Sequence, residues 1–325
     1  MGGDVGLETT IPAVVIALKK QAELHCTLVG DETQIKATLE NHQLSGSAQK
    51  RLHIQHASQI VEMDEAPALA LRKKKDSSMR VAINLVKEGK ADACVSAGNT
   101  GALMATARFV LKMIHGIDRP AICSALPRLN GVTHMLDLGA NVDTPPKGLL
   151  QFGLMGVAVA SIVDNIENPT VGLLNVGAED VKGNDQVKKT SSLFQESKLN
   201  YIGFVEGDDI FLGDVDVIVC DGFVGNVALK SSEGVAKLMA AILRQEFSKS
   251  FTTKCSALVA KPVINAFKNR MDPGRFNGAS LVGVNGIVIK SHGGADAAGF
   301  SCAIMVAIKE AQAGMINNIQ SHLAQ

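Results

Sequence analysis

Five short segments of the sequence combine glycine with polar side chains, and each directly follows an apolar run. They are SAGNTG (96–101), DLGANVD (137–143), NVGAEDVKGND (175–185), CDGFVGN (220–226) and KSHGGAD (290–296). Glycine lets backbone N–H groups approach a ligand closely, and the start of a following helix adds unpaired N–H groups that favour anions. Ligands of open α/β sheets bind beyond the carboxyl ends of the strands. We therefore expect these loops to converge at one edge of a sheet and to bind phosphate there.

Two of these loops resemble each other. Residues 98–101 and 222–225 both follow an apolar run and both open a helical pattern. The similarity indicates either an internal duplication or two walls of one site. A single glycine after a strand is also typical of an ordinary turn, so the prediction depends on the number of such loops.

A histidine lies inside one of the loops. His292 stands two residues after Lys290, and its ordinary pKa range suits a general acid or base near neutral pH. It is equally suited to bind phosphate. The same position also fits a histidine that bonds the carbonyl groups of its own loop, and both interpretations stay open at this stage.

Several common catalytic and cofactor motifs are missing from the sequence. It contains no GxGxxG dinucleotide fingerprint, no GxxxxGK[ST] phosphate loop, no GxSxG nucleophile and no HExxH zinc motif. Asp137, Asp143 and Asp221 could hold Mg²⁺, but an aspartate at a strand end more often caps the next helix. We therefore predict an enzyme without a metal or other cofactor.

The charge balance argues against a nucleic-acid partner. Lys plus Arg and Asp plus Glu are both 32, and aromatic residues make up only 4% of the chain. The local exception is the basic run LRKKKDSSMR (71–80), which precedes a serine that could cap a helix. Such a run is typical either of a solvated face or of a surface that docks an acidic partner.

Cysteine usage and hydropathy favour a cytoplasmic protein. The six cysteines are scattered without a CxxC pair, as expected for reduced thiols. No signal peptide is visible. The most apolar run, 149–163, contains Gln151 and is shorter than the about 20 residues that span a bilayer.

Apolar runs and helical patterns alternate along the chain, which predicts an α/β protein with helices on both faces of a sheet. The runs that predict strands are 24–30, 52–57, 92–97, 121–126, 132–139, 170–177, 199–207, 215–222 and 281–293. The patterns that predict helices are 11–20, 78–90, 100–113, 146–164, 224–247 and 295–323. Two pairs of runs, 121–126 with 132–139 and 199–207 with 215–222, lie so close that we expect some antiparallel pairing and therefore a mixed sheet.

No linker divides the chain, so we expect one domain over residues 1–325, with two intertwined subdomains as the alternative. The segment 245–272 departs from the rhythm of the rest and predicts a protruding helical element. It is either a surface hairpin or a basic amphipathic tip that contacts lipid or a partner.

Nine motifs together resemble the bacterial phosphate acyltransferase family, from the first residues to near the end of the chain. They are MGGD (1–4), RKKKDSSM (72–79), CVSAGNTGALM (94–104), LDLGANVD (136–143), LLQFGLMG (149–156), EDVKGND (179–185), CDGFVGNVALK (220–230), FNGASLVGVNG (276–286) and IKSHGGAD (289–296). The resemblance implies transfer of a fatty acyl group from acyl carrier protein to inorganic phosphate. The acyl phosphate then feeds phospholipid synthesis through a membrane glycerol-phosphate acyltransferase.

The resemblance also implies a fold and an assembly. The fold is a three-layer α/β/α sandwich with a mixed sheet, of the isocitrate/isopropylmalate dehydrogenase type, and the enzymes are homodimers related to phosphotransacetylases. In the family a short strand precedes the MGGD loop. We therefore expect Met1 to be an internal methionine rather than the natural start, with a first strand missing before it.

We assign expected roles on this basis. The catalytic candidates are His292, Lys182, Asn99 and Asn226. The candidates for phosphate binding or orientation are Gly2, Gly3, Asp4, Ser96, Gly98, Thr100, Gly101, Asp137, Asn141, Asp143, Asp221, Gly222, Gly225, Lys290 and Gly293. The candidates for docking the carrier protein are Arg72, Lys73, Lys74 and Lys75.

Other functions compete with this one. A phosphotransacetylase-like enzyme would use acyl-CoA as the donor, and a decarboxylating dehydrogenase would share the implied fold. A non-catalytic scaffold that binds acyl carrier protein or membrane, with peripheral membrane association, is the alternative from another class. A scaffold has no need of so many polar glycine loops.

Overall fold

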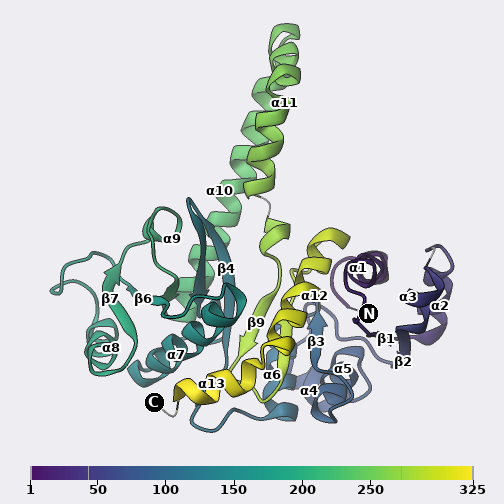
Figure 1. Ribbon diagram of the computed structural model, residues 1–325, viewed down its shortest axis with the longest axis horizontal. Coiled ribbons are helices and arrows are strands. Elements are labelled where there is room, and N and C mark those ends of the chain that lie inside the picture. Colours follow the sequence, from purple (N-terminus) through teal and green to yellow (C-terminus); the bar gives the residue numbers. More distant parts are fainter. Residues whose placement is uncertain (1, 43, 272, 324–325) are drawn as a thin grey trace.

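The computed structural model describes residues 2–42, 44–271 and 273–323. A mixed eight-stranded sheet lies at its centre, in the order β3-β10-β9-β4-β5-β8-β6-β7 (Figure 1). The strands are β3 (Ala93–Ser96), β4 (Ala121–Arg128), β5 (Gly131–Leu136), β6 (Thr170–Leu174), β7 (Asn200–Val205), β8 (Val217–Val219), β9 (Ala279–Val282) and β10 (Ile287–Lys290). The predicted mixed sheet is confirmed.

The strands of this sheet run in two directions. β10 is parallel to β3, and the antiparallel strand β9 separates it from β4. β5 is antiparallel to β4, and β5, β8, β6 and β7 are parallel to one another. The carboxyl ends of β3 and β10 therefore point opposite to those of β5, β6 and β8.

Helices cover both faces of the sheet because successive strand residues point to opposite sides. In β5, Met135 packs in one core and Leu136 in the other, and Leu281 and Val282 of β9 divide in the same way. The helices that contribute to the first core are α4 (Pro67–Lys73), α5 (Ser78–Lys87), α6 (Thr100–Leu111) and α9 (Asp209–Leu212). Those that contribute to the second are α7 (Pro146–Val163), α8 (Asp185–Glu196), α12 (Ala297–Gln312) and α13 (Met315–Leu323).

A smaller unit precedes the main sheet. Its strands β1 (Cys26–Gly30) and β2 (Leu52–His56) form a parallel pair that is not hydrogen-bonded to the eight-stranded sheet. The helices α1 (Leu7–Lys20), α2 (Glu32–Leu39) and α3 (Gly46–Lys50) surround this pair, and their apolar side chains share a core with α12. A cavity of about 610 Å³ lies between β1 and β3.

Two long helices form an arm that projects from the body (Figure 1). α10 (Gly222–Ser248) and α11 (Phe251–Met271) pack against each other, and the short 3₁₀ helix η1 (Pro273–Phe276) leads back to β9. Large apolar side chains are exposed along the arm, including Val235, Leu238 and Val259. In its described part, the segment 245–272 is the end of α10, a bend at residues 249–250 and the helix α11.

The apolar helix α7 is the one helix among the described residues that is long and apolar enough to cross a membrane. Most of it, 61%, is buried inside the protein, where Leu149, Phe152 and Met155 belong to the second core. Burial in the core explains its apolar sequence.

Two predicted elements are divided in the structure. The run 281–293 was expected as one strand, but a turn through residues 283–286 reverses the chain, and β9 and β10 pair antiparallel. The pattern 295–323 was expected as one helix, but α12 and α13 meet at Gly314, whose φ of 64° does not fit a helix. The predicted closeness of 199–207 and 215–222 does not produce a hairpin, since β6 lies between β7 and β8.

Candidate active site

Three of the predicted loops lie together at the ends of β3 and β10. The backbone N–H of Asp4 donates to the carbonyl of Gly293 at 3.2 Å, and that of Ser291 donates to Ser96 at 2.9 Å. Gly3 lies against Ala97, and Gly2 lies beside the Cα atom of Gly98. The MGGD loop, the loop after β3 and the loop after β10 therefore form one cluster, which we call the first cluster; Met1 lies outside the described residues.

Asn99 holds the first cluster in place. Its Oδ1 accepts a hydrogen bond from the backbone N–H of Ala102 at 3.0 Å and so caps α6. Its Nδ2 lies 2.8–3.2 Å from three carbonyl oxygens, those of Glu62, Met63 and Glu65. The buried amide has no hydrogen left for a ligand, so the structure assigns Asn99 to positioning, and the predicted contact of its side chain with phosphate is wrong. Thr100 is exposed and Gly101 is partly exposed at the start of α6, whereas Gly98 is buried and its N–H donates to Ser96 Oγ at 3.2 Å.

Lys290 brings positive charge to this cluster. Its Nζ donates to the carbonyl of Ala97 at 3.4 Å and also to the carbonyl of Ser291. Burial lowers the pKa of Lys290 to about 8; Asp4 opposes this shift, and Lys230 adds to it. Burial disfavours the charged form of a lysine, and a nearby anion favours it. A bound anion would therefore stabilise the Lys290 ammonium.

His292 is exposed in the same cluster, and its ring orientation is fixed by its own loop. Its Nδ1 accepts a hydrogen bond from the backbone N–H of Gly294 at 3.1 Å. In the neutral ring the hydrogen then resides on Nε2, which is the nitrogen that can donate to a substrate.

The buried Asn277 holds the loop of His292 through hydrogen bonds. It was not among the residues predicted from the sequence. Its Oδ1 accepts from the backbone N–H of His292 at 2.9 Å. Its Nδ2 donates to Ser291 Oγ and to the carbonyl of Gly299, both at 2.8 Å. Its place in the motif FNGASLVGVNG was the only signal that could have pointed to it.

A second cluster surrounds Asp137, directly after β5. The buried carboxylate accepts backbone N–H groups of Ile122, Ala140 and Asn141 at 2.7–3.0 Å and the side-chain amide of Asn141 at 2.9 Å. Burial raises the pKa of Asp137, although these hydrogen bonds act in the opposite direction. The side chains of Asp137 and Asn141 therefore fix the conformation of the loop 137–143 through hydrogen bonds within the protein.

The start of α10 completes the second cluster. Asp221 caps this helix by accepting from the N–H of Phe223 at 2.9 Å, and it also accepts from the N–H of Thr144 at 2.8 Å. A Cβ at Gly222 would lie 2.2 Å from the carbonyl oxygen of Asn141, and one at Gly225 would lie 2.0 Å from that of Asp137. Only glycine lets the helix start so close to this loop. Both loops that looked alike in the sequence thus open a capped helix.

Three other predicted residues lie at the periphery of the second cluster. Asn226 is exposed, with its side chain against Gly139, and Asp143 is exposed with a φ of 55°. Lys182 is exposed and lies 3.9 Å from Glu179. A hydrogen bond from Gln186 to the carbonyl of Thr144 ties the loop of Lys182 to that of Asp143.

The two clusters do not share one sheet edge, so the expectation that all loops converge at one edge is wrong. β10 and β5 are three strand spacings apart, about 14 Å. The first turns of α10 connect the clusters, because Gly222 and Gly225 contact the second cluster while the charge of Lys230 acts on Lys290. The candidate site is therefore two groups of loops along one helix.

The basic run lies at the end of α4. Arg72, Lys73 and Lys75 are exposed. Lys74 is only partly exposed; its Nζ donates to the carbonyl of Ile60 at 3.0 Å and lies 3.8 Å from Glu65. Among the described residues, no group of three His, Cys, Asp or Glu side chains could hold a metal ion.

The sequence has related proteins over its whole length. It is 57% identical over 325 residues to the phosphate acyltransferase of Chromobacterium violaceum, covering 100% of this chain and 94% of that protein. The chain belongs to the phosphate acyltransferase family. It is also 56% identical over 323 residues to the phosphate acyltransferase of Nitrosococcus oceani, covering 99% and 94% of the two chains. Residues 1–318 match the family described as "Fatty acid synthesis protein". The chain is thus an acyltransferase, and its family supports acyl transfer to phosphate.

Solved structures of lower identity share the fold. A phosphotransacetylase from Streptococcus pyogenes superposes with a TM-score of 0.62 at 18% identity, covering 94% of this chain and 92% of that one. A branched-chain phosphotransacylase from Enterococcus faecalis gives a TM-score of 0.59 at 14% identity, covering 95% and 97%. The dehydrogenase type of fold implied by the resemblance stays a prediction.

Proposed function

We propose that this enzyme transfers a fatty acyl group from acyl carrier protein to inorganic phosphate and releases acyl phosphate. The observation that carries the proposal is the first cluster, in which a half-buried lysine and the start of α6 adjoin an exposed histidine. The lysine and the helix start favour a bound anion, and the histidine beside them can interact with a proton in transfer.

Phosphate binds in the first cluster. The Lys290 ammonium and the backbone N–H groups of Thr100 and Gly101 surround the anion, and Ser96 and Thr100 offer hydroxyl groups at the same place. Asp4 keeps Lys290 charged, since its carboxylate favours the ammonium form. The glycines of the loops, Gly2, Gly3 and Gly293 among them, allow the backbone to approach the ligand.

One phosphate oxygen attacks the thioester carbonyl, so that a C–O bond forms and the C–S bond breaks. The carbonyl oxygen becomes an oxyanion beside the start of α6, whose backbone N–H groups supply donors for it, while Asn226 and Lys182 of the second cluster hold the rest of the acyl donor. The Nε2–H of His292 donates a hydrogen bond to the departing thiolate, which takes its proton from the phosphate hydroxyl. The net reaction moves that proton from phosphate to the thiol and needs no covalent enzyme intermediate.

The acidic carrier protein docks on the end of α4. Arg72, Lys73 and Lys75 are exposed there and can pair with carboxylates of a partner. Lys74 supports the surface from inside, since it bonds Ile60. Docking of this kind steers association and weakens with salt.

The enzyme works as a cytoplasmic homodimer, and its product is consumed by a membrane glycerol-phosphate acyltransferase for phospholipid synthesis. The exposed apolar residues of α10 and α11 support the dimer, because such surface is normally covered. Peripheral contact of the arm tip with a membrane is compatible with the same residues.

Acyl-CoA is the alternative donor, favoured by the likeness of the fold to phosphotransacetylases. The test supplies the purified enzyme with phosphate and either palmitoyl-acyl carrier protein or palmitoyl-CoA. Acyl phosphate is trapped as a hydroxamate and quantified. We expect the carrier-protein thioester to react at least tenfold faster at equal concentration. A faster reaction of the CoA thioester would assign the enzyme to the alternative, and no hydroxamate from either donor would refute phosphate as the acceptor.

A further inference from the structure

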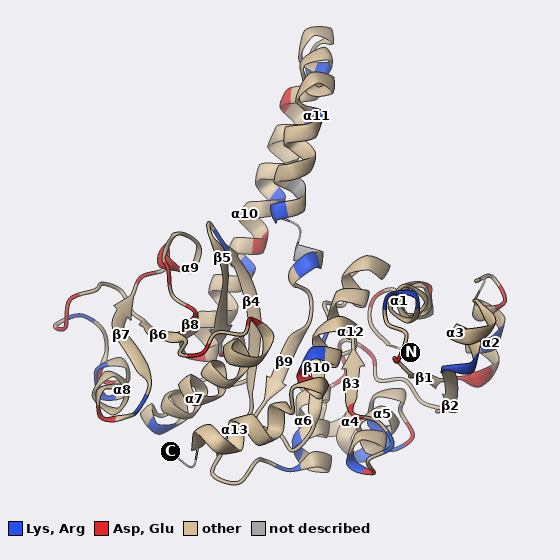
Figure 2. Ribbon diagram, viewed as in Figure 1, with Lys and Arg blue, Asp and Glu red and all other residues tan. Residues whose placement is uncertain are grey.

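The foot of the arm holds three arginines that the proposed reaction does not use. Arg128 ends β4, Arg270 lies in the last turn of α11, and Arg275 lies in η1. They line one hollow of about 280 Å³, together with Pro127, Gly131, Asn269 and Phe276. Figure 2 shows Lys and Arg positions gathered where the arm meets the body.

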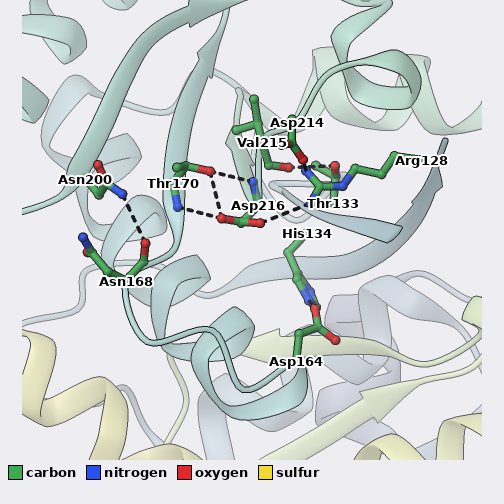
Figure 3. A network of polar contacts seen from close by, with 10 residues as sticks. All are labelled: Arg128, Thr133, His134, Asp164, Asn168, Thr170, Asn200, Asp214, Val215 and Asp216. Atoms are coloured by element: carbon green, nitrogen blue, oxygen red, sulfur yellow. Dashed lines mark hydrogen bonds and ion pairs between the residues drawn. The ribbon is translucent and has the colours of Figure 1, made fainter. Parts of the chain in front are cut away.

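Arg128 forms the floor of this hollow. Only 10% of its side chain is exposed, and its Nη1 and Nη2 lie 3.1 Å from Asp214 and 3.3 Å from Asp216 (Figure 3). Asp216 also accepts the N–H and the hydroxyl of Thr170, both at 2.9 Å. The Nε of Arg128 is buried and has no hydrogen-bond partner in the described part of the chain. A buried donor without a partner is uncommon and indicates a missing acceptor.

The other two arginines, Arg270 and Arg275, are exposed and make few hydrogen bonds to the described residues. Arg270 donates one N–H group to the carbonyl of Leu129, and Arg275 donates one to the carbonyl of Asn269 at 3.1 Å. A guanidinium has five N–H groups, so several remain on each side chain. Among the ion pairs of the described residues, none involves Arg270 or Arg275.

The charge and shape of the hollow favour a phosphate group. Among the described residues, the three guanidinium groups of the hollow carry one positive charge more than the two carboxylates paired with Arg128, those of Asp214 and Asp216. Guanidinium pairs with phosphate through two parallel N–H···O bonds, and phosphate has enough oxygens to meet more than one arginine. A carboxylate, with two oxygens, could satisfy fewer of these donors.

We propose that this hollow is a second phosphate-binding site, which takes inorganic phosphate or the terminal phosphate of an organic monoester. It is separate from the candidate active site. The residues that line the hollow belong to neither cluster, and β9 lies between β4, which Arg128 ends, and β10, which Lys290 ends. The proposal therefore stands whether or not the first cluster binds phosphate.

Phenylglyoxal labelling, which modifies accessible arginines, tests the site residue by residue. The full chain is labelled with and without inorganic phosphate, at constant ionic strength kept with sodium chloride, and labelled peptides are quantified by mass spectrometry. We expect phosphate to slow the labelling of Arg270 and Arg275 at least threefold. The exposed Arg244 on α10 is the internal control and should label at the same rate throughout.

Variants separate the two sites. Arg270→Gln should abolish the protection of Arg275, whereas Arg244→Gln should leave it unchanged. Lys290→Ala, in the first cluster, should also leave it unchanged even if it abolishes activity. Equal labelling rates with and without phosphate, or protection that is lost in Lys290→Ala, would overturn the proposal.

A second arm of the experiment distinguishes the source of the phosphate group. Ethyl phosphate replaces inorganic phosphate at the same concentration. Equal protection by both supports a site that holds a monoester, and protection by inorganic phosphate alone supports a site for the free anion.

Discussion

At the scale of single residues, Lys290 connects burial to a measurable pH dependence. Its pKa of about 8 means that the ammonium is present below that pH and is lost as the pH rises through it. If the ammonium binds phosphate, the KM for phosphate should rise about tenfold per pH unit above pH 8. Lys290→Arg should flatten this rise between pH 8 and 9.5, because guanidinium stays charged. Initial rates over a range of phosphate concentrations check it, and an unchanged slope in the variant would contradict the assignment.

The lowered pKa of Lys290 also makes the free energy of unfolding depend on pH. The unfolded chain keeps its lysine protonated up to its ordinary pKa of 10.5, while the folded chain loses the proton near 8. Between these values the unfolded state binds more protons, so the contribution of Lys290 to stability becomes more favourable as the pH rises. Lys290→Met should remove this dependence, and denaturant unfolding at pH 7.5 and 10 measures it.

Asn277 provides a test of positioning at the same scale. Asn277→Ala removes three hydrogen bonds that hold Ser291, His292 and the start of α12. We expect kcat to fall about 10- to 100-fold while the chain stays folded, with a stability loss of about 1–3 kcal/mol.

Asn285→Ala is the matched control for that variant. Asn285 is exposed in the turn between β9 and β10, and its side chain donates to the carbonyl of Met113. It should keep kcat within about twofold, since surface changes of this kind usually cost little. Equal losses in the two variants would show that Asn277 has no particular link to His292.

At the scale of elements, the close start of α10 is the feature to perturb. Gly225→Ala places a methyl group 2.0 Å from the carbonyl oxygen of Asp137, so the helix must move away from the second cluster. We expect a stability loss of about 1–3 kcal/mol and a fall in kcat of at least tenfold. Gly234→Ala on the same helix meets nothing within 4 Å and should stabilise the protein by up to about 1 kcal/mol. Thermal unfolding and hydroxamate formation measure both, and similar behaviour of the two variants would contradict the role of Gly225.

Most elements could be predicted from the sequence, but their directions could not. Apolar runs and helical periods located the strands and the helices that open after the loops of Gly98 and Gly222, because burial and capping leave local patterns. Which strand pairs with which depends on contacts between distant segments, and β9 and β10 were therefore read as one strand. The same reason explains why the loops after β5 and β10 were expected at one edge. Apart from its place in the motif FNGASLVGVNG, Asn277 left no signal in the sequence, since its contacts with Ser291 and Gly299 are made through tertiary structure.

At the scale of the whole molecule, the arm is the feature that a single chain leaves unexplained. Val235, Leu238 and Ile242 lie three to four residues apart on α10 and so form one stripe. Their exposed fractions are 56%, 59% and 47%. A long pair of helices with such a stripe gains stability when a second copy covers it, and this supports the proposed dimer.

Charge placed on this stripe should therefore dissociate the dimer. In Leu238→Glu with Ile242→Glu, each substitution should cost about 1.5–3 kcal/mol of buried apolar surface, so the dimer Kd should rise by about 10² to 10⁴. Lys237→Glu, a neighbouring exposed position on α10, changes the charge but not the stripe and should leave the Kd within a few-fold. Sedimentation velocity over a dilution series measures all three proteins. A native chain that stays monomeric at micromolar concentration would refute the dimer itself, whereas a double variant that dimerises like the native chain would place the interface away from α10.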